Sequence, residues 1–316
     1  GQGETLDMLG MASGHVIRLK DQLAYYRDAV VKFRALDDRK ALASALSNLT
    51  LCALDPTLAE EAIEIAHQIS WYSGEAYACL TAGTAYSFYG HFKDSLTYMQ
   101  RAQELAQAID HTEWLAGSYV FLSFVYWDLL ELSTAVDCLE KGIALATLVS
   151  SHWFSEMGRG FLARVRIEQG DLDAAEKLLA QGEVPDPPTM QHSTAQLAEA
   201  ELALARGDAE TALSLSERLW AAWHLDGEAV PLNTMVLVPC LVIKARAMAL
   251  LGRFAEAVEL LEYTRRNCEE RNLLASLWRV EILLGEVVAQ QDRELSRWYF
   301  AQAREHVRQL AKYAPE

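Results

Sequence analysis

A short signature that recurs along the chain constrains its fold more than any other feature. It consists of a glycine or polar residue, an apolar residue two positions later, and a small residue three positions after that, where an apolar run begins. Weaker copies stand 33 residues apart before the first clear one. Self-similarity at such a period is typical of chains that stack one structural unit many times. We call the small residues the markers. Ala29 and Ala62 are the weaker markers. From Ala62, steps of 33, 40, 40, 37 and 45 residues lead to Ser95, Ala135, Ala175, Ala212 and Ala257.

Each repeat contains two helical patterns, and no segment has the alternation of a strand. Small and apolar residues recur three or four positions apart, as Ala78, Ala82 and Ala85 do, which is the period of a helix. Glycines between the two patterns favour the left-handed conformation that ends a helix. A small residue also stands twelve positions before each marker from Ser95 to Ala257, as Gly83 does before Ser95, and lets paired helices approach closely. We therefore expect an all-α fold, a solenoid of antiparallel helix pairs with about 7 units of 33–45 residues.

The charge of the chain argues against two classes of partner. There are 28 Lys and Arg residues against 44 Asp and Glu residues, a net charge of −16, so nucleic acid and anionic membrane surfaces would both repel the chain. The most apolar stretch, residues 235–243, is far shorter than the ~20 residues that span a bilayer. Five scattered cysteines without a Cys-x-x-Cys pair are typical of reduced thiols. We expect a cytoplasmic protein with no direct nucleic-acid contact and no membrane contact.

Signatures of catalysis, of cofactor binding and of metal binding are absent. The sequence has no phosphate loop, no dinucleotide fingerprint, no zinc-protease motif and no nucleophile elbow. Glu64 and His67 have the spacing used in di-iron bundles, but such sites need a second copy and further carboxylates on facing helices. A solvated helix face is the better interpretation of this pair. We expect no catalytic residue, no cofactor and no metal; an enzyme with an unrecognised site between repeats is the alternative from another functional class.

The repeats resemble tetratricopeptide repeats (TPR). The resemblance rests on Ala-Leu-Ser-Asn-Leu-Thr at residues 45–50 and on the Gly-x-aromatic-x-x-small motifs, and it covers the chain from about Tyr25 onward. Thr50 replaces the usual glycine, and Leu130 stands where glycine would end a first helix. The long units and residues 26–43 resemble the TPR regions of bacterial STAND-type signalling ATPases and maltose-activator-like transcriptional regulators. This resemblance implies a right-handed superhelix whose first helices line a concave groove, and a repeat region that binds an inducer or a partner protein.

The domain organisation has one open point. We expect residues 1–316 to form a single TPR-like domain, a fragment of a longer protein. A Pro-rich connector at 183–189 interrupts the helices, because a residue before proline is pushed out of the α region. A longer loop within one continuous solenoid is the simpler interpretation, and a hinge between 1–182 and 190–316 is the alternative. The last pattern, at 294–313, is rich in Arg, Glu and Gln, which predicts a solubilising cap.

The candidate binding site is the groove. Positions one and four residues after the small residue of a first helix, and three and six before it, should face this groove. Aromatic and arginine side chains there offer rigid contact area for a partner, whereas plain core packing is the alternative for the aromatics. Asn48 matches one position of the family's clamp for a terminal carboxylate, but the lysines of the next units are missing, so an acidic peptide tail is a poor candidate. The candidate partner-binding residues are Asn48, Tyr77, Thr84, Phe88, Phe124, Trp127, Asp128, Arg164 and Glu168.

These observations predict a non-catalytic protein-interaction or ligand-sensing module of a bacterial signalling or transcriptional regulator. The groove would hold a partner helix, a peptide, or an apolar small-molecule inducer. The alternative function is a free-standing TPR adaptor that assembles partner proteins.

Overall fold

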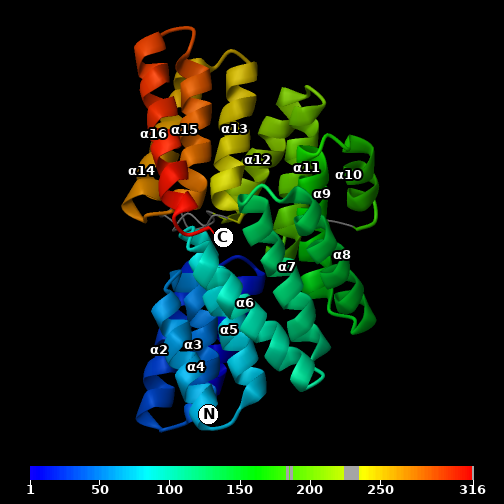
Figure 1. Ribbon diagram of the computed structural model, residues 1–316, viewed down its shortest axis with the longest axis vertical. Coiled ribbons are helices and arrows are strands. Elements are labelled where there is room, and N and C mark those ends of the chain that lie inside the picture. Colours follow the sequence, from blue (N-terminus) through cyan, green and yellow to red (C-terminus); the bar gives the residue numbers. More distant parts are fainter. Residues whose placement is uncertain (183–184, 186–187, 224–234, 315–316) are drawn as a thin grey trace. The chain divides into compact units, whose positions relative to one another are not determined.

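The computed structural model describes residues 1–314 except 183–184, 186–187 and 224–234, and this part of the chain is all-α (Figure 1). Its helices alternate as the first and second members of eight antiparallel pairs. The first helices are α1 (Gln2–His15), α3 (Arg39–Ala53), α5 (Tyr72–Phe88), α7 (Thr112–Asp128), α9 (His152–Glu168), α11 (Ser193–Ala205), α13 (Leu237–Leu250) and α15 (Leu274–Val288). The second helices are α2 (Leu19–Ala35), α4 (Pro56–Gln68), α6 (Phe92–Ala108), α8 (Leu132–Leu148), α10 (Leu172–Leu179), α12 (Ala209–Trp223), α14 (Phe254–Glu270) and α16 (Arg293–Ala311). A short 3-10 helix, η1 (Met190–His192), precedes α11.

Helix length and turn length together explain the 40-residue steps. From α5 to α9 every helix has 17 residues, and each begins 20 residues after the previous one. The turns contain one residue in the left-handed region. Gly90 and Gly170 occupy it inside their pairs, as the sequence predicts, whereas Leu130 takes it with a φ of 62°. The missing glycine at Leu130 therefore changes the residue in the turn and not the conformation of the turn.

Small residues hold the two helices of a pair together, which confirms the prediction from their spacing. The Ser95 hydroxyl donates to the Gly83 carbonyl oxygen over 2.7 Å, and a Cβ on Gly83 would lie 2.9 Å from Cγ of Met99. Ser296 on α16 makes the equivalent 2.8 Å bond to Gly285 on α15. Ser296 is thus an eighth marker, so the chain has eight pairs where the sequence predicts about seven. Arg293 stands three positions before Ser296, where the signature has an apolar residue, and this is why the repeat pattern did not include it.

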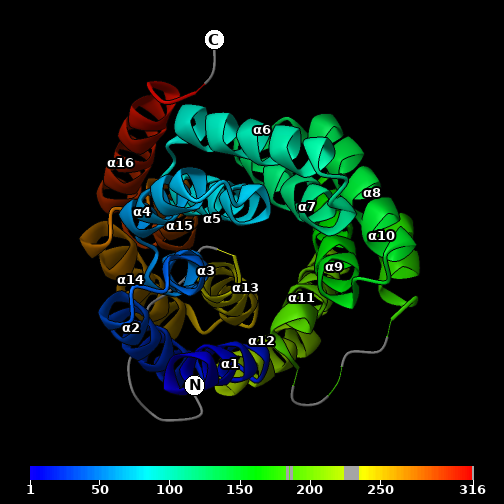
Figure 2. The same ribbon diagram turned by 90° about the horizontal axis from the view of Figure 1, so that it is seen from below.

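The chain divides into two compact units. Unit 1 comprises Gly1–Ser87, Phe92–Gly158 and Thr189–Gln191, and unit 2 comprises Phe88–His91, Arg159–Pro188 and His192–Glu316. In unit 1, α3, α5 and α7 lie in one layer and α4, α6 and α8 in the other (Figure 2). In unit 2, α11, α13 and α15 lie in one layer and α12, α14 and α16 in the other. Most of the connector at 183–189 lies outside the described residues, so the subdivision around it stays a prediction.

Helix α16 does not have the surface of a polar cap. Four of its apolar side chains are well exposed, namely Leu295 at 38%, Trp298 at 45%, Phe300 at 38% and Val307 at 44%. The Arg and Glu residues that predict a solubilising cap are exposed on this helix, and these apolar residues share its surface with them.

Candidate binding surface on the first helices

Four side chains from successive first helices of unit 1 form a continuous row. We call Asp7 on α1, Asn48 on α3, Tyr77 on α5 and Trp114 on α7 the first-helix row. Nδ2 of Asn48 donates to Oδ1 of Asp7 over 3.4 Å, and Oδ1 of Asn48 accepts a 2.7 Å hydrogen bond from the Tyr77 hydroxyl. The Tyr77 ring stacks on Trp114 with centroids 4.5 Å apart. All four residues are partly buried, so each is fixed by its neighbours and keeps a solvent-facing part.

The start of α7 fixes the orientation of Trp114. His111 is the N-cap residue of this helix, and its Nδ1 accepts a 3.3 Å hydrogen bond from the Trp114 backbone N–H. The His111 and Trp114 rings stack with centroids 5.1 Å apart. The indole Nε1–H donates to the Ser73 hydroxyl on α5 over 3.2 Å. Trp114 is therefore held at its ring face and at its N–H, which lowers the entropy that a ligand would have to remove.

The ionisation of these groups limits their chemistry. Burial raises the pKa of Asp7, and the hydrogen bond from Asn48 opposes this rise. Burial also raises the pKa of the Tyr77 hydroxyl far above its ordinary value, so this group stays protonated and donates to Asn48. The Cys52 thiol, which donates to the Asn48 carbonyl oxygen over 3.3 Å, has its pKa raised by burial to about 12. At neutral pH the row offers hydrogen bonds and ring faces, and neither the hydroxyl nor the thiol is a nucleophile.

Asn48 keeps a donor for a ligand. Its amide carries two N–H hydrogens, one of which serves Asp7. The other makes no hydrogen bond within the described part of the chain. Met11 lies one turn from Asp7 on α1 and is 44% exposed, and a thioether adapts well to apolar partners. The row thus offers a free amide donor and aromatic surface, and α1 adds an exposed methionine one turn from Asp7.

Five of the predicted site residues belong to unit 1 on its first helices and keep some exposure. Asn48 and Tyr77 are direct hydrogen-bond partners, as described above. Phe124, Trp127 and Asp128 lie farther along α7 and are partly buried, and the Phe124 ring packs 6.1 Å from that of Phe121. The structure therefore brings two predicted residues into the row and places three others toward the end of one of its helices.

Two predicted residues on α5 are buried. Thr84 is 1% exposed, and its hydroxyl donates to the Leu80 carbonyl oxygen in its own helix over 2.8 Å. Phe88 is 6% exposed and belongs to unit 2. The structure does not place either side chain on an open surface, because the face of α5 that carries them is covered.

The remaining two predicted residues lie on the part of α9 that belongs to unit 2. Arg164 is 6% exposed and binds Glu201 on α11 through two 2.8 Å hydrogen bonds. Glu168 is exposed near the end of the same helix. Arg164 thus joins two successive first helices and does not face an open groove.

Sequence reasoning missed Asp7 and Trp114. On α7 the groove positions are counted from the small residue Ser123, so Val120 and Gly117 stand three and six residues before it. One further step of three residues reaches Trp114. Gly117 itself is closed off, since a Cβ there would lie 2.5 Å from Cζ of Phe154. Asp7 carries no such signal, because the repeat signature begins after α1.

Metal and membrane signatures can be checked directly for the described residues. They contain no group of three or more His, Cys, Asp and Glu residues placed to hold a metal ion. His67 Nδ1 lies 3.3 Å from Oε2 of Glu75 on α5, and Glu64 accepts a hydrogen bond from Gln68. Among the helices of this part of the chain, none combines the length and apolarity needed to cross a bilayer.

Solved structures of helical repeat proteins are similar to this chain over nearly its whole length. A Rap protein complexed with Competence and Sporulation Factor has 12% identity and a TM-score of 0.65, and the match covers 99% of this chain and 100% of that one. The Rap conjugation gene regulator of the plasmid pLS20, in complex with the Phr* peptide, has 13% identity and a TM-score of 0.65, with 99% and 97% covered. Yeast Tom70 has 14% identity and a TM-score of 0.54, with 98% and 65% covered. At these identities the similarity shows the fold.

The family follows from the sequence match. No curated protein matches the chain. Residues 39–296, which contain α3 to α15 and the start of α16, match the model of the MalT-like TPR region. The chain belongs to the family of MalT-like TPR regions.

Proposed function

We propose that this chain is a non-catalytic module of a signalling or transcriptional regulator and that it binds a peptide or a partner helix along the first-helix row. The observation that carries the proposal is the row itself, in which side chains from four successive first helices touch one another and remain partly exposed. The two Rap proteins with the same fold are complexed with Competence and Sporulation Factor and with the Phr* peptide, which supports a peptide as the ligand class.

The length of the row favours a peptide over a small inducer. Packed helices lie 8–10 Å apart, so four of them span about 25 Å. An extended peptide covers this distance with about eight residues at 3.3 Å each. A small apolar ligand would touch only one or two of the four side chains.

The chemistry of the row indicates which peptide would fit. The second N–H of Asn48 would donate to a peptide carbonyl oxygen, while Trp114 at one end of the row and Met11 at the other would each contact a different apolar side chain. Asp7 and the net charge of −16 disfavour an acidic peptide. We therefore propose an apolar or amphipathic segment without excess negative charge.

Selection from a displayed library of random 12-residue peptides tests this function. Peptides recovered on the intact chain would be labelled and titrated by fluorescence anisotropy. Tyr77→Leu and Trp114→Leu should weaken their binding at least tenfold, because each removes one of the stacked rings. Tyr72→Leu is the matched control, since Tyr72 lies on the same helix as Tyr77 and is 52% exposed outside the row.

Circular dichroism of the three variants would establish that their helical content is unchanged. Peptides that bind the Tyr77 and Trp114 variants as tightly as the wild type would exclude the row as the binding surface.

A further inference from the structure

The second helices share two buried positions, counted from the marker. The residue four positions after the marker is buried in six of these helices. Four second helices before α16, namely α6, α8, α12 and α14, are long enough to include the residue eleven positions after the marker, and it is buried in all four. Leu179 on the short α10 is partly exposed. The buried residues at the first position are Phe33, Ala66, Met99, Leu139, Ser216 and Leu261, and those at the second are Ala106, Ala146, Trp223 and Cys268.

The first helix of the same pair covers one side of the four-residue position, as Gly3 does for Phe33 and Gly83 does for Met99, and the following first helix packs on the same second helices. The first helices α3, α7, α13 and α15 pack against the second helices that precede them. Cys240 on α13, for example, donates to the carbonyl oxygen of Ser216, which is the four-residue position of α12. Burial at the two positions therefore reports a helix docked on that edge.

On α16 the same two positions are Phe300 and Val307, and they are exposed. Phe300 packs on one side against Gly285 of its own pair, where an added Cβ would lie 2.9 Å from the ring. Even so, 38% of Phe300 and 44% of Val307 remain accessible, whereas Leu261 and Cys268 on α14 are fully buried. The edge keeps apolar residues at the docking positions, and no described helix covers them.

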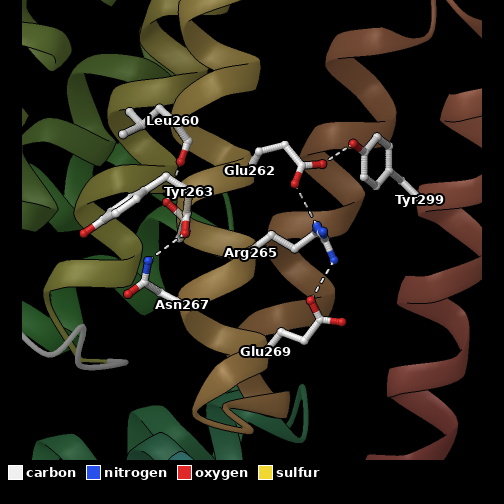
Figure 3. Close-up of polar contacts among 8 residues, drawn as sticks. Leu260, Glu262, Tyr263, Arg265, Asn267, Glu269 and Tyr299 are labelled. Carbon is white, nitrogen blue, oxygen red and sulfur yellow. Dashed lines mark hydrogen bonds and ion pairs between the residues drawn. The ribbon is translucent and has the colours of Figure 1, made fainter.

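The charges beside these positions show what kind of helix would fit. Arg265 on α14 stands eight residues after the marker and pairs with Glu262 and Glu269 at 3.1 Å each (Figure 3). Its guanidinium also lies 5.8 Å from the centroid of the Trp298 ring on α16. Arg304 is the equivalent residue on α16. In place of the two glutamates it has Ala301 and Arg308, so its own helix supplies no carboxylate.

Arg304 makes no ion pair within the described part of the chain, and neither does Arg297, two turns earlier on the same side. The opposite side of α16 is already attached to α14, where Tyr299 donates to Glu262 (Figure 3). The exposed side is therefore not needed to hold α16 in place.

We propose that Arg297, Phe300, Arg304 and Val307, here called the α16 edge, dock an acidic amphipathic helix of a partner protein. The apolar stripe of that helix covers Phe300 and Val307, in the place that a next first helix would take. Its carboxylates pair with Arg297 and Arg304, which lack such partners in this chain. Two copies of this chain that met symmetrically through this edge would oppose arginine to arginine.

A designed probe tests the proposal directly. It is a labelled 18-residue helical peptide with leucines at i, i+3, i+4 and i+7 flanked by glutamates, and a second peptide has lysine at every glutamate. Both are titrated against the intact chain by fluorescence anisotropy. We expect the glutamate peptide to bind at least tenfold more tightly than the lysine peptide. This preference would run against the overall charge of the chain, so it would report the local edge.

Two variants and one control locate the binding. Arg304→Glu and Val307→Asp should each raise the Kd of the glutamate peptide at least tenfold. Arg266→Glu is the matched control, because Arg266 is also exposed but lies on α14 away from the edge, and its Kd should equal that of the wild type. Circular dichroism would verify the fold of all three. Trp114→Leu should leave this Kd unchanged, so the test stands apart from the proposal for the first-helix row.

Several results would overturn the proposal. Equal affinity for the two peptides, or equal losses in Arg304→Glu and Arg266→Glu, would mean that the edge selects nothing. Self-association in sedimentation that Val307→Asp abolishes would assign the edge to a second copy of the chain. Binding to phosphatidylcholine vesicles with 30% phosphatidylserine, without binding to either peptide, would assign it to a membrane.

Discussion

The ion pair between Arg164 and Glu201 has an exposed counterpart with two hydrogen bonds of nearly the same length, so the two pairs can be compared for the effect of burial on stability. Arg164 binds Glu201 at 2.8 and 2.8 Å, and Arg206 binds Glu176 at 2.8 and 2.9 Å. The side chains of the first pair are 6% and 20% exposed, and those of the second are 40% and 57% exposed. The two pairs therefore differ strongly in burial and hardly in bond length.

We expect Glu201→Gln to lower the free energy of unfolding by about 3 kcal/mol, because it removes the charge of the carboxylate that binds this buried guanidinium through two hydrogen bonds. This is the lower end of the range for buried pairs, since Glu201 keeps some access to water. Glu176→Gln should have a far smaller effect, because water screens an exposed pair. The double replacement of Arg164→Met with Glu201→Leu removes both charges and should recover most of the loss.

Equilibrium urea denaturation measures these differences, and hydrogen exchange of the α9 and α11 amides localises them, since repeat arrays unfold in parts. If Glu201→Gln and Glu176→Gln cost the same, the reasoning from burial is refuted. If the double variant is no more stable than Glu201→Gln, the cost is not that of an uncompensated charge.

Two further predictions concern a turn and a buried carboxyl group. Leu130→Gly should raise the free energy of unfolding by about 1 kcal/mol in urea denaturation, because Leu130 is 61% exposed and holds a left-handed φ of 62°. Gly170→Ala should lower it by a similar amount, since a Cβ there meets nothing and only the φ of 81° resists it; effects of the same sign would contradict this. Burial raises the pKa of Glu281 while its hydrogen bond with His306 opposes the rise, so the protonated form is favoured in the folded state. The stability gained from the protonated form is present below the ordinary pKa of about 4.5 and is lost as the pH rises through the raised pKa of the folded state. The wild type should therefore lose stability relative to Glu281→Gln above about pH 4.5. Parallel pH profiles of the free energy of unfolding would disprove this prediction.

The helix pairs could be predicted because their contacts are local. Gly83 and Ser95 lie twelve residues apart, and the turn between them fixes how the two helices meet. The same spacing recurs at each marker, so each copy supports the prediction made from the others. The eighth pair was missed because Arg293 stands where the signature has an apolar residue, although Ser296 makes the same contact.

The binding surface could be predicted only in part, because it depends on how one pair packs on the next. The sequence places Asn48 and Tyr77 on successive first helices, and the structure joins them by a hydrogen bond. Arg164 stands at such a position as well, but its partner Glu201 lies 37 residues away and closes that face. Spacing within one helix cannot show which of its faces a neighbouring pair will cover.

The even spacing of helix starts from α5 to α9 also decides how such a chain can change length. Deletion of residues 112–151 would join the turn after α6 directly to α9, so that a first helix would still follow a second helix. Deletion of only half as many residues would place a second helix where a first helix belongs. Every helix after the deletion would then lie in the wrong layer. Insertion or deletion of whole helix pairs therefore preserves the two-layer arrangement, whereas a change by a single helix exchanges the two layers.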